Sequence, residues 1–174
     1  EVIKHANPTR DFNNIVLRMK ALNPDIVIPA NYYNEYALLV RTMQQQKVQP
    51  KAVYSVLGGA ASSFKFLKEF PDAANGIIDC NHWFNPKDKR ALDLRKRVEA
   101  KNLFFTYEIF NTYTAMMFLA DAINRAKSTD RAAINAALAS STFSDHFMPY
   151  GTTKMVDGQN MGAQPLMTQV VGGD

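Results

Sequence analysis

Residues 12–30, FNNIVLRMKALNPDIVIPA, predict a helix followed directly by a buried strand. Apolar residues recur every three or four positions from Phe12 to Leu22, which indicates a helix with one apolar face. Pro24 ends this helix, because proline disfavours the helical conformation in the residue before it. The run 25–30 is almost continuously apolar, which is typical of a strand in a parallel sheet that helices cover on both faces.

The alternation of helix and strand continues along the chain. A second helix is expected over residues 34–46 and a strand over 51–57, then a short helix over 64–70 and a strand over 76–80. Strands that alternate with helices usually form a parallel sheet. The sequence therefore predicts an α/β fold, a three-layer sandwich around a parallel sheet, in which a ligand would bind beyond the carboxyl ends of the strands.

The C-terminal part of the chain departs from this alternation. Apolar spacing predicts a long helix over residues 107–127 and an alanine-rich helix over 131–139. Residues 152–156 and 166–171 have the residue types of strands and are expected to pair with each other, with a turn at 157–158. This pair would close the fold.

The composition is that of a folded globular protein. Of the 174 residues, 47% are hydrophobic and 21% are charged, and no apolar run approaches the roughly 20 residues that span a membrane. Much of the net charge of +4 comes from residues 87–101, where basic side chains are interleaved with acidic ones and with an apolar stripe. This pattern indicates a solvated amphipathic helix, so no nucleic-acid partner is expected.

Motifs for catalysis and for metal or nucleotide binding are missing from the sequence. The three histidines, His5, His82 and His146, are not spaced as ligands on one helix, and Cys80 is the only cysteine, so no internal disulfide can form. Neither a glycine-rich nucleotide loop nor a Gly-x-Ser-x-Gly motif occurs. We expect a non-enzymatic binding protein without metal or cofactor, the less favoured alternative being a small α/β enzyme that uses Cys80 or His82.

Polar and aromatic residues lie at the ends of the three predicted strands. Asn31 and Tyr32 follow the first strand, Ser55 and Gly58 lie at the end of the second, and Trp83 follows the third. Such residues suit a small-molecule site, which combines aromatic walls with a few oriented polar groups. The alternatives are that Tyr32 covers a helix end and that Trp83 packs in the core.

Glu108 lies at the start of the long helix among aromatic residues. One interpretation is a solvated acid in the first helical turn, where the helix dipole favours a negative charge. The other is a buried carboxylate that receives an ammonium or amide group of a ligand, because a buried charge needs a partner. The sequence leaves both open.

The order of these elements resembles the second half of the type I periplasmic solute-binding proteins, in particular the branched-chain amino acid (Leu/Ile/Val-binding) receptors of ABC transporters. The resemblance covers nearly the whole chain, through the order and spacing of several short motifs. These motifs are TRDF at 9–12, LNPDIVI at 22–28 with the loop at Tyr32, ANGI at 74–77, YTAMMFLADAINRA at 113–126, YG at 150–151 and DGQN at 157–160.

The resemblance implies a two-lobed clamp with the ligand in the cleft between the lobes. Residues 1–82 would form βα units of the second lobe, residues 83–149 would return to the first lobe, and residues 150–174 would be the closing strand pair of the second lobe. The N-terminal half and the signal peptide of such a protein would lie outside this chain. A periplasmic or extracytoplasmic location is implied.

The resemblance also assigns roles to the candidate residues. Tyr32 falls where the family has a ligand-contacting aromatic residue. The loop around Ser55 and Gly58 carries, in amino-acid receptors, an acid for the ammonium group of the ligand, but this chain has Val56 and Leu57 there. The departure argues against an ordinary α-amino acid. Glu108 would then take over the cation-binding role. The expected ligand-binding set is Asn31, Tyr32, Ser55, Gly58, Trp83 and Glu108.

The function implied is the substrate-binding component of an ABC importer, which captures an amino acid, an amide or a small aromatic acid. Its partners would be this small-molecule ligand and an ABC permease in the membrane. A ligand-sensing regulatory domain of the same fold is the alternative. Because a single lobe would leave apolar faces in water, self-association or exchange of elements between copies is also expected.

Overall fold

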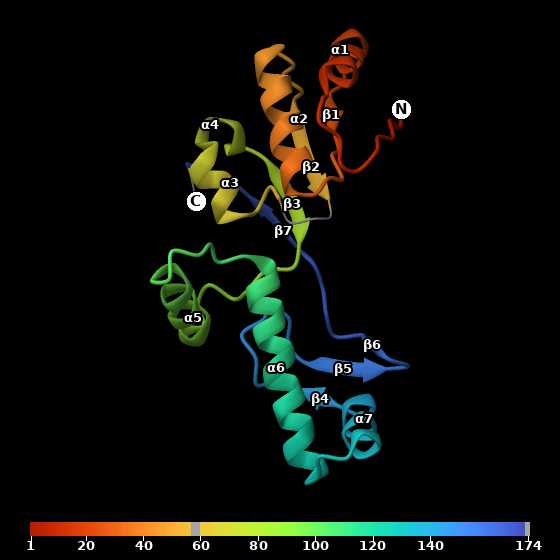
Figure 1. Ribbon diagram of the computed structural model, residues 1–174, viewed down its shortest axis with the longest axis vertical. Helices are drawn as coiled ribbons and strands as arrows, with labels where there is room; N and C mark the ends of the chain where they lie inside the picture. The colour runs from red at the N-terminus through yellow and green to blue at the C-terminus, as the bar shows by residue number, and fades with distance from the viewer. Residues whose placement is uncertain (57–59, 173–174) are drawn as a thin grey trace. The chain divides into compact units, whose positions relative to one another are not determined.

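The computed structural model describes residues 1–56 and 60–172 (Figure 1). Gly58, one of the candidate ligand-binding residues, and its neighbour Leu57 lie outside the described residues.

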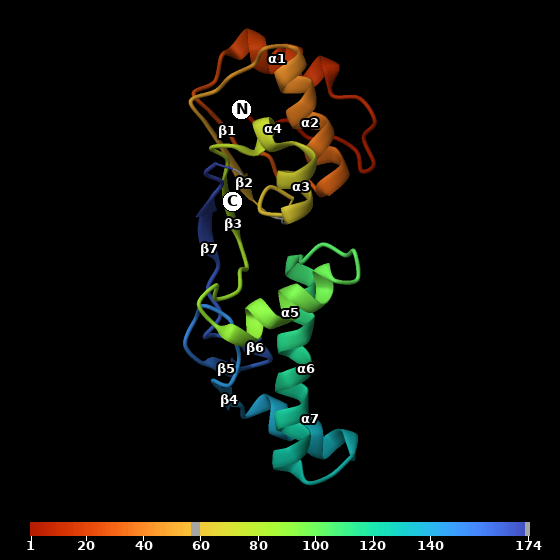
Figure 2. The ribbon, with the colours of Figure 1, turned by 90° about the vertical axis from the view of Figure 1, so that its left-hand side faces the viewer.

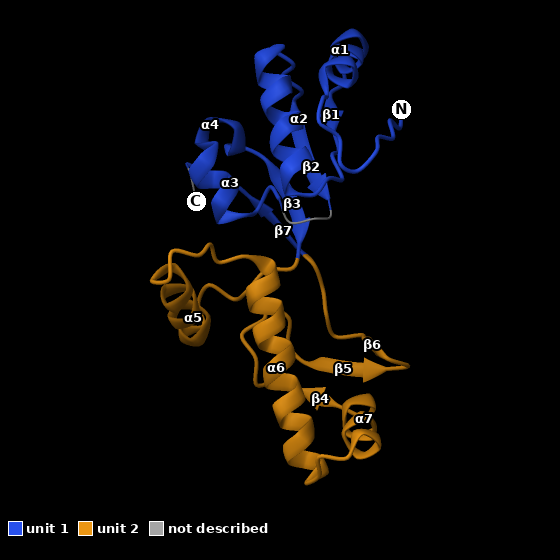
Figure 3. Ribbon diagram, in the orientation of Figure 1, with its two compact units in different colours: residues 1–81, 166–174 blue, residues 82–165 orange. Residues whose placement is uncertain are grey.

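The chain forms two compact units (Figure 3). Unit 1 consists of residues 1–81 and 166–174, and unit 2 consists of residues 82–165. Unit 2 thus contains both residues 83–149 and residues 150–165. The lobe to which each stretch belongs stays a prediction.

The described residues of unit 1 form a four-stranded sheet and four helices. In chain order these are α1 (Asn13–Leu22), β1 (Ile26–Val27), α2 (Tyr33–Gln45), β2 (Ala52–Val56), α3 (Phe64–Glu69), α4 (Pro71–Ala74), β3 (Ile78–Asn81) and β7 (Leu166–Gln169). α1 ends at Asn23, which adopts the left-handed conformation with φ 46° immediately before Pro24. The expected alternation of helices and strands is therefore present, with α4 as an additional short helix that begins at a proline.

The sheet has the strand order β1-β2-β3-β7, and β1, β2 and β3 run parallel. Val27 of β1 is in register with Val53 of β2, and Ser55 of β2 is in register with Asp79 of β3. This direction confirms the prediction of an α/β fold with a parallel sheet. It also places the carboxyl ends of the three strands at the same edge.

The pairing expected between residues 152–156 and 166–171 is wrong. β7 runs antiparallel to β3 in unit 1, whereas β5 (Thr153–Val156) pairs with β6 (Gln159–Asn160) in unit 2. The two residues between β5 and β6, Asp157 and Gly158, both have positive φ, at 49° and 76°. Two such residues form the tight turn that best suits a hairpin, so β5 pairs across this turn and β7 is left to pair with β3.

Helices α1 to α4 all lie on one face of the sheet of unit 1 (Figure 2). Val53 of β2 contacts two apolar clusters beneath these helices, one around the buried Phe66 and one around the buried Phe12. Side chains on the opposite face of the sheet are more open to solvent: Ile26 is 57% exposed and Met167 is 67% exposed. The first strand is apolar on both faces, as expected, but the helices of unit 1 cover only one of them.

Unit 2 consists of three helices and a small antiparallel sheet. Its elements are α5 (Lys89–Glu99), α6 (Tyr107–Ala126), α7 (Arg131–Ala139), β4 (Thr142–Phe143), β5 and β6, with the strand order β4-β5-β6. α5 buries Ala91 and Leu94 and leaves its basic residues largely in solvent, as the sequence indicates. Among the described helices none is sufficiently long and apolar to cross a membrane.

We expect Asp130→Ala to destabilise α7. The Asp130 side chain caps this helix, because its Oδ2 accepts a hydrogen bond of 2.9 Å from the backbone N–H of Ala133. Loss of such a cap costs about 0.5–2 kcal/mol of the free energy of unfolding. Urea denaturation followed by circular dichroism measures this cost. Asp130→Asn, which retains an acceptor oxygen, should restore most of it, and equal losses in the two variants would contradict the capping role.

Candidate functional site

The loop between β1 and α2 presents two candidate residues in opposite directions. Asn31 is 7% exposed and Tyr32 is 65% exposed. Tyr32 has an extended backbone, with φ −72° and ψ 167°, and its carbonyl oxygen accepts a hydrogen bond of 2.9 Å from the N–H of Tyr36. Because neighbouring residues of an extended segment point to opposite sides, the loop turns Asn31 inward and leaves the Tyr32 ring available for contact.

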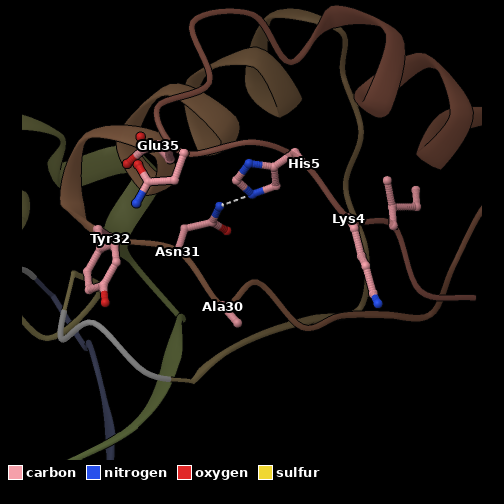
Figure 4. Close-up of a pocket in the computed structure, with 8 residues that line it drawn as sticks. Lys4, His5, Ala30, Asn31, Tyr32 and Glu35 are labelled. Atoms are coloured by element: carbon pink, nitrogen blue, oxygen red, sulfur yellow. Dashed lines mark hydrogen bonds between the residues drawn. The ribbon is translucent and has the colours of Figure 1, made fainter.

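Asn31 is held by the N-terminal segment of the chain. Its Nδ2 donates a hydrogen bond of 2.7 Å to Nε2 of His5, which accepts as a neutral imidazole (Figure 4). The other ring nitrogen, Nδ1, lies 2.8 Å from the carbonyl oxygen of Ala6 and donates to it in this tautomer. The His5 ring also packs edge-on against Phe12, with 5.0 Å between centroids. These contacts join His5 to the loop that follows β1.

A pocket of about 400 Å³ lies between these two segments (Figure 4). Its volume is in the range of sites for small molecules. The residues that line it are Ile3, Lys4, His5, Asn7, Ala30, Asn31, Tyr32 and Glu35. Most are polar, so the pocket suits a small polar solute that forms hydrogen bonds with the protein.

Glu35 is the most deeply placed charged residue of this pocket. It lies in the first turn of α2 and is 6% exposed. Within the described part of the chain, its carboxylate forms no ion pair and accepts no hydrogen bond. Neither His5 nor Glu35 is among the ligand contacts predicted from the sequence. The spacing of Glu35, four residues from Leu39 and eight from Met43, places it on the buried face of the helix and is the signal that could have indicated it.

Ser55 lies in the interior of unit 1 and does not line this pocket. It is fully buried beside Asp79, which is 2% exposed, and the hydroxyl group of Tyr36 faces the same interior. None of these three side chains has a hydrogen-bond partner of ordinary geometry among the described residues. Whether Ser55 contacts a ligand stays a prediction.

Burial raises the pKa of the Asp79 carboxyl above its ordinary value. The hydroxyl groups of Ser62 and Ser55 oppose this shift without reversing it. Burial also raises the pKa of Tyr36, and the charge of Asp79 adds to that shift. The cluster therefore disfavours ionisation of Asp79 and of Tyr36 relative to the same groups in water.

The other two candidate residues belong to unit 2. Trp83 stacks on Phe84, with 5.3 Å between centroids, and meets Phe110 edge-on at 5.9 Å, so it is part of an aromatic cluster. Glu108 lies in the first turn of α6 and is exposed. Its position corresponds to that of a solvated first-turn acid. Ligand contacts of Trp83 and Glu108 stay predictions.

The described residues contain no group of three histidine, cysteine or acidic side chains that could hold a metal ion. Cys80 is half-buried on β3, and it points away from Asp79, since successive residues of a strand face opposite sides of the sheet.

Comparison with known proteins identifies a family and a fold. The sequence model of the family described as periplasmic binding protein matches residues 1–174. None of the curated protein sequences compared with the chain matches it.

Several solved structures share the fold. A leucine binding protein from Thermotoga maritima superposes with a TM-score of 0.77 at 21% identity, over 98% of this chain and 48% of that one. A branched-chain amino acid transporter substrate binding protein from Streptococcus pneumoniae, in complex with isoleucine, gives 0.78 at 17% identity, over 98% and 48%. An ABC transporter solute binding protein from R. palustris, in complex with benzoate, gives 0.75 at 17% identity, over 97% and 46%. The chain thus spans about half the length of these proteins.

Proposed function

The chain belongs to the periplasmic binding protein family, and on that premise we propose that it is part of the substrate-binding component of an ABC importer. This component would capture a small solute, such as an amino acid, an amide or a small aromatic acid, outside the cytoplasm. The observation that carries the proposal is the pocket at the carboxyl end of β1, which Asn31 and Tyr32 line together. Open parallel sheets bind their ligands at this edge.

The pocket would form one wall of a cleft between two lobes. Because the chain spans about half the length of the solved structures that it matches, the whole protein would supply further ligand contacts from residues outside this chain. Ser55, Gly58, Trp83 and Glu108 are proposed as further ligand contacts.

Ligand binding would act by shifting a conformational equilibrium. A solute that touches both lobes binds the closed state more tightly than the open state, so its binding increases the population of the closed state. A permease in the membrane would recognise that closed state. No group transfer or redox chemistry is required of the protein, which fits a binding role instead of an enzymatic one.

Tyr32→Ala tests the proposal directly. We expect the full-length protein to retain a solute through purification, which native mass spectrometry would detect and identify. The variant should bind this solute more weakly by about 1–2 kcal/mol, because the ring would lose the apolar area that it buries against the ligand. Isothermal titration calorimetry measures the difference.

Leu17→Ala is the matched control for Tyr32→Ala. Leu17 is 55% exposed on α1 of the same unit and does not line the pocket. Its substitution should leave the affinity unchanged. Equal affinity of the wild type and Tyr32→Ala would show that the pocket at β1 is not the site.

A further inference from the structure

Glu35 lies on the buried face of α2, at a position where a helix ordinarily has an apolar residue. Leu39 and Met43, four and eight residues further along α2, are 3% and 4% exposed, and Glu35 itself is 6% exposed. Glutamate is almost never this buried without a partner, because removing a charge from water is costly. The position of this carboxylate therefore requires an explanation.

A role in capping α2 does not account for the carboxylate. Glu35 is the third residue of the helix after Tyr32, where a glutamate can accept a hydrogen bond from the backbone N–H of the residue that precedes the helix. No such bond is formed among the described residues. The helix dipole favours a negative charge here, but it does not replace a partner for a buried carboxylate.

The carboxylate is open to the pocket and not to the interior. Both carboxyl oxygens of Asp79 are fully buried and have no hydrogen-bond partner among the described residues. The oxygens of Glu35 do not belong to this group of fully buried atoms, so they keep some contact with solvent. Glu35 lines the pocket together with Asn31 and Tyr32. An unpartnered carboxylate therefore faces a space of about 400 Å³.

The groups around Glu35 also suit a positive charge. Nδ2 of Asn31 is engaged by His5, so Oδ1 of Asn31 is left as a second acceptor. The exposed ring of Tyr32 adds an aromatic face, which attracts cations. The one cationic side chain in the lining, Lys4, forms no ion pair among the described residues, and Figure 4 shows its amino group directed away from Glu35.

We propose that Glu35 is the residue that receives a cationic N–H group of the solute, an ammonium, amidinium or guanidinium group. This inference rests on the proposed function and deepens it. It assigns to Glu35, in unit 1, the cation-binding role that was expected of Glu108 from the sequence. The solute then carries at least one positive charge, and Glu35 selects for it.

The test compares probes that differ only in a cationic group. Leucine is paired with 2-hydroxy-4-methylpentanoate, and benzamidine is paired with benzamide. Titration calorimetry on the full-length protein should show binding of at least one cationic member in preference to its neutral-group partner. In Glu35→Gln this preference should fall by about 10- to 100-fold, the scale of a lost charge-assisted hydrogen bond. The affinity for the partner without the cation should be unchanged.

Two controls separate this role from charge and folding effects. Asp25→Asn changes the net charge equally, at the opposite end of β1, where Asp25 is paired with Lys51 at 2.6 Å, and it should leave the preference intact. Without ligand, Glu35→Gln should have the same melting temperature as the wild type or a higher one, because an unpartnered buried carboxylate is removed. A structural carboxylate would instead lower the melting temperature when it is replaced.

Several outcomes would overturn the assignment. The assignment fails if Glu35→Gln keeps the preference for the cationic probe, or if Glu108→Gln loses this preference while Glu35→Gln keeps it. It also fails if Glu35→Gln lowers the melting temperature, or if the wild type prefers the probes without the cation. The assignment fails as well if neither of the two cationic probes binds. If a probe without the cation binds and Tyr32→Ala weakens it, the proposed function stands while the role of Glu35 fails. If no probe binds and no solute is retained, both fail.

Discussion

Phe66→Ala should lower the free energy of unfolding of the full-length protein by about 3–5 kcal/mol, as is usual when a buried aromatic ring is removed. Phe66 of α3 is fully buried. Its ring meets those of Tyr36 and Phe70 at centroid distances of 5.1 and 5.4 Å. The cavity left by the ring would lie between α2, α3 and α4, and the surrounding side chains would refill it only in part.

Chemical denaturation followed by circular dichroism and by tyrosine fluorescence measures this loss. Phe64→Ala is the matched control, because Phe64 lies on the same helix but is only half-buried. Its substitution should cost clearly less. A cost for Phe66→Ala no larger than that for Phe64→Ala would contradict the placement of Phe66 at the centre of this cluster.

Asp79→Asn should remove a decline in stability that the wild type shows with rising pH. Burial raises the pKa of Asp79 in the folded state. Above the ordinary aspartate pKa of about 3.9, the unfolded chain therefore binds fewer protons at this residue than the folded protein. The free energy of unfolding then falls as pH rises, by up to about 1.4 kcal/mol per pH unit, until the folded-state pKa is passed.

The measurement is a series of urea denaturation curves from pH 4 upward for the wild type and the variant. At neutral pH the Asp79→Asn protein should be the more stable of the two, because its amide is not ionised when buried. Asp72→Asn, at an exposed acid of α4, controls for the change in net charge. Parallel pH profiles for the wild type and Asp79→Asn would contradict the effect of burial on this carboxyl.

The sequence was sufficient to predict the parallel sheet and the place of Asn31 and Tyr32 beyond the carboxyl end of its first strand. The helix at 12–22 and the apolar run at 25–30 predict a βα repeat, and such repeats place Asn31 and Tyr32 at the ligand-binding edge. The structure brings these two residues together in one pocket. This part of the prediction depends only on local periodicity and on the preferred direction of consecutive strands.

The remaining parts depend on contacts between distant segments. The turn at Asp157 and Gly158 indicates a hairpin, but the identity of its second strand follows from φ angles that the sequence does not display. His5 reaches Asn31 across 26 positions of the chain. Glu35 lines one pocket together with residues from the distant N-terminal segment, and its spacing from Leu39 alone did not predict that place.

The central claim is that a small solute binds in the pocket at the carboxyl end of β1. A crystal structure of the full-length protein with the solute that it retains through purification tests this claim most directly. We expect electron density for the solute in contact with the Tyr32 ring and the Asn31 amide. Density for the solute elsewhere, with neither side chain in contact, would contradict the claim.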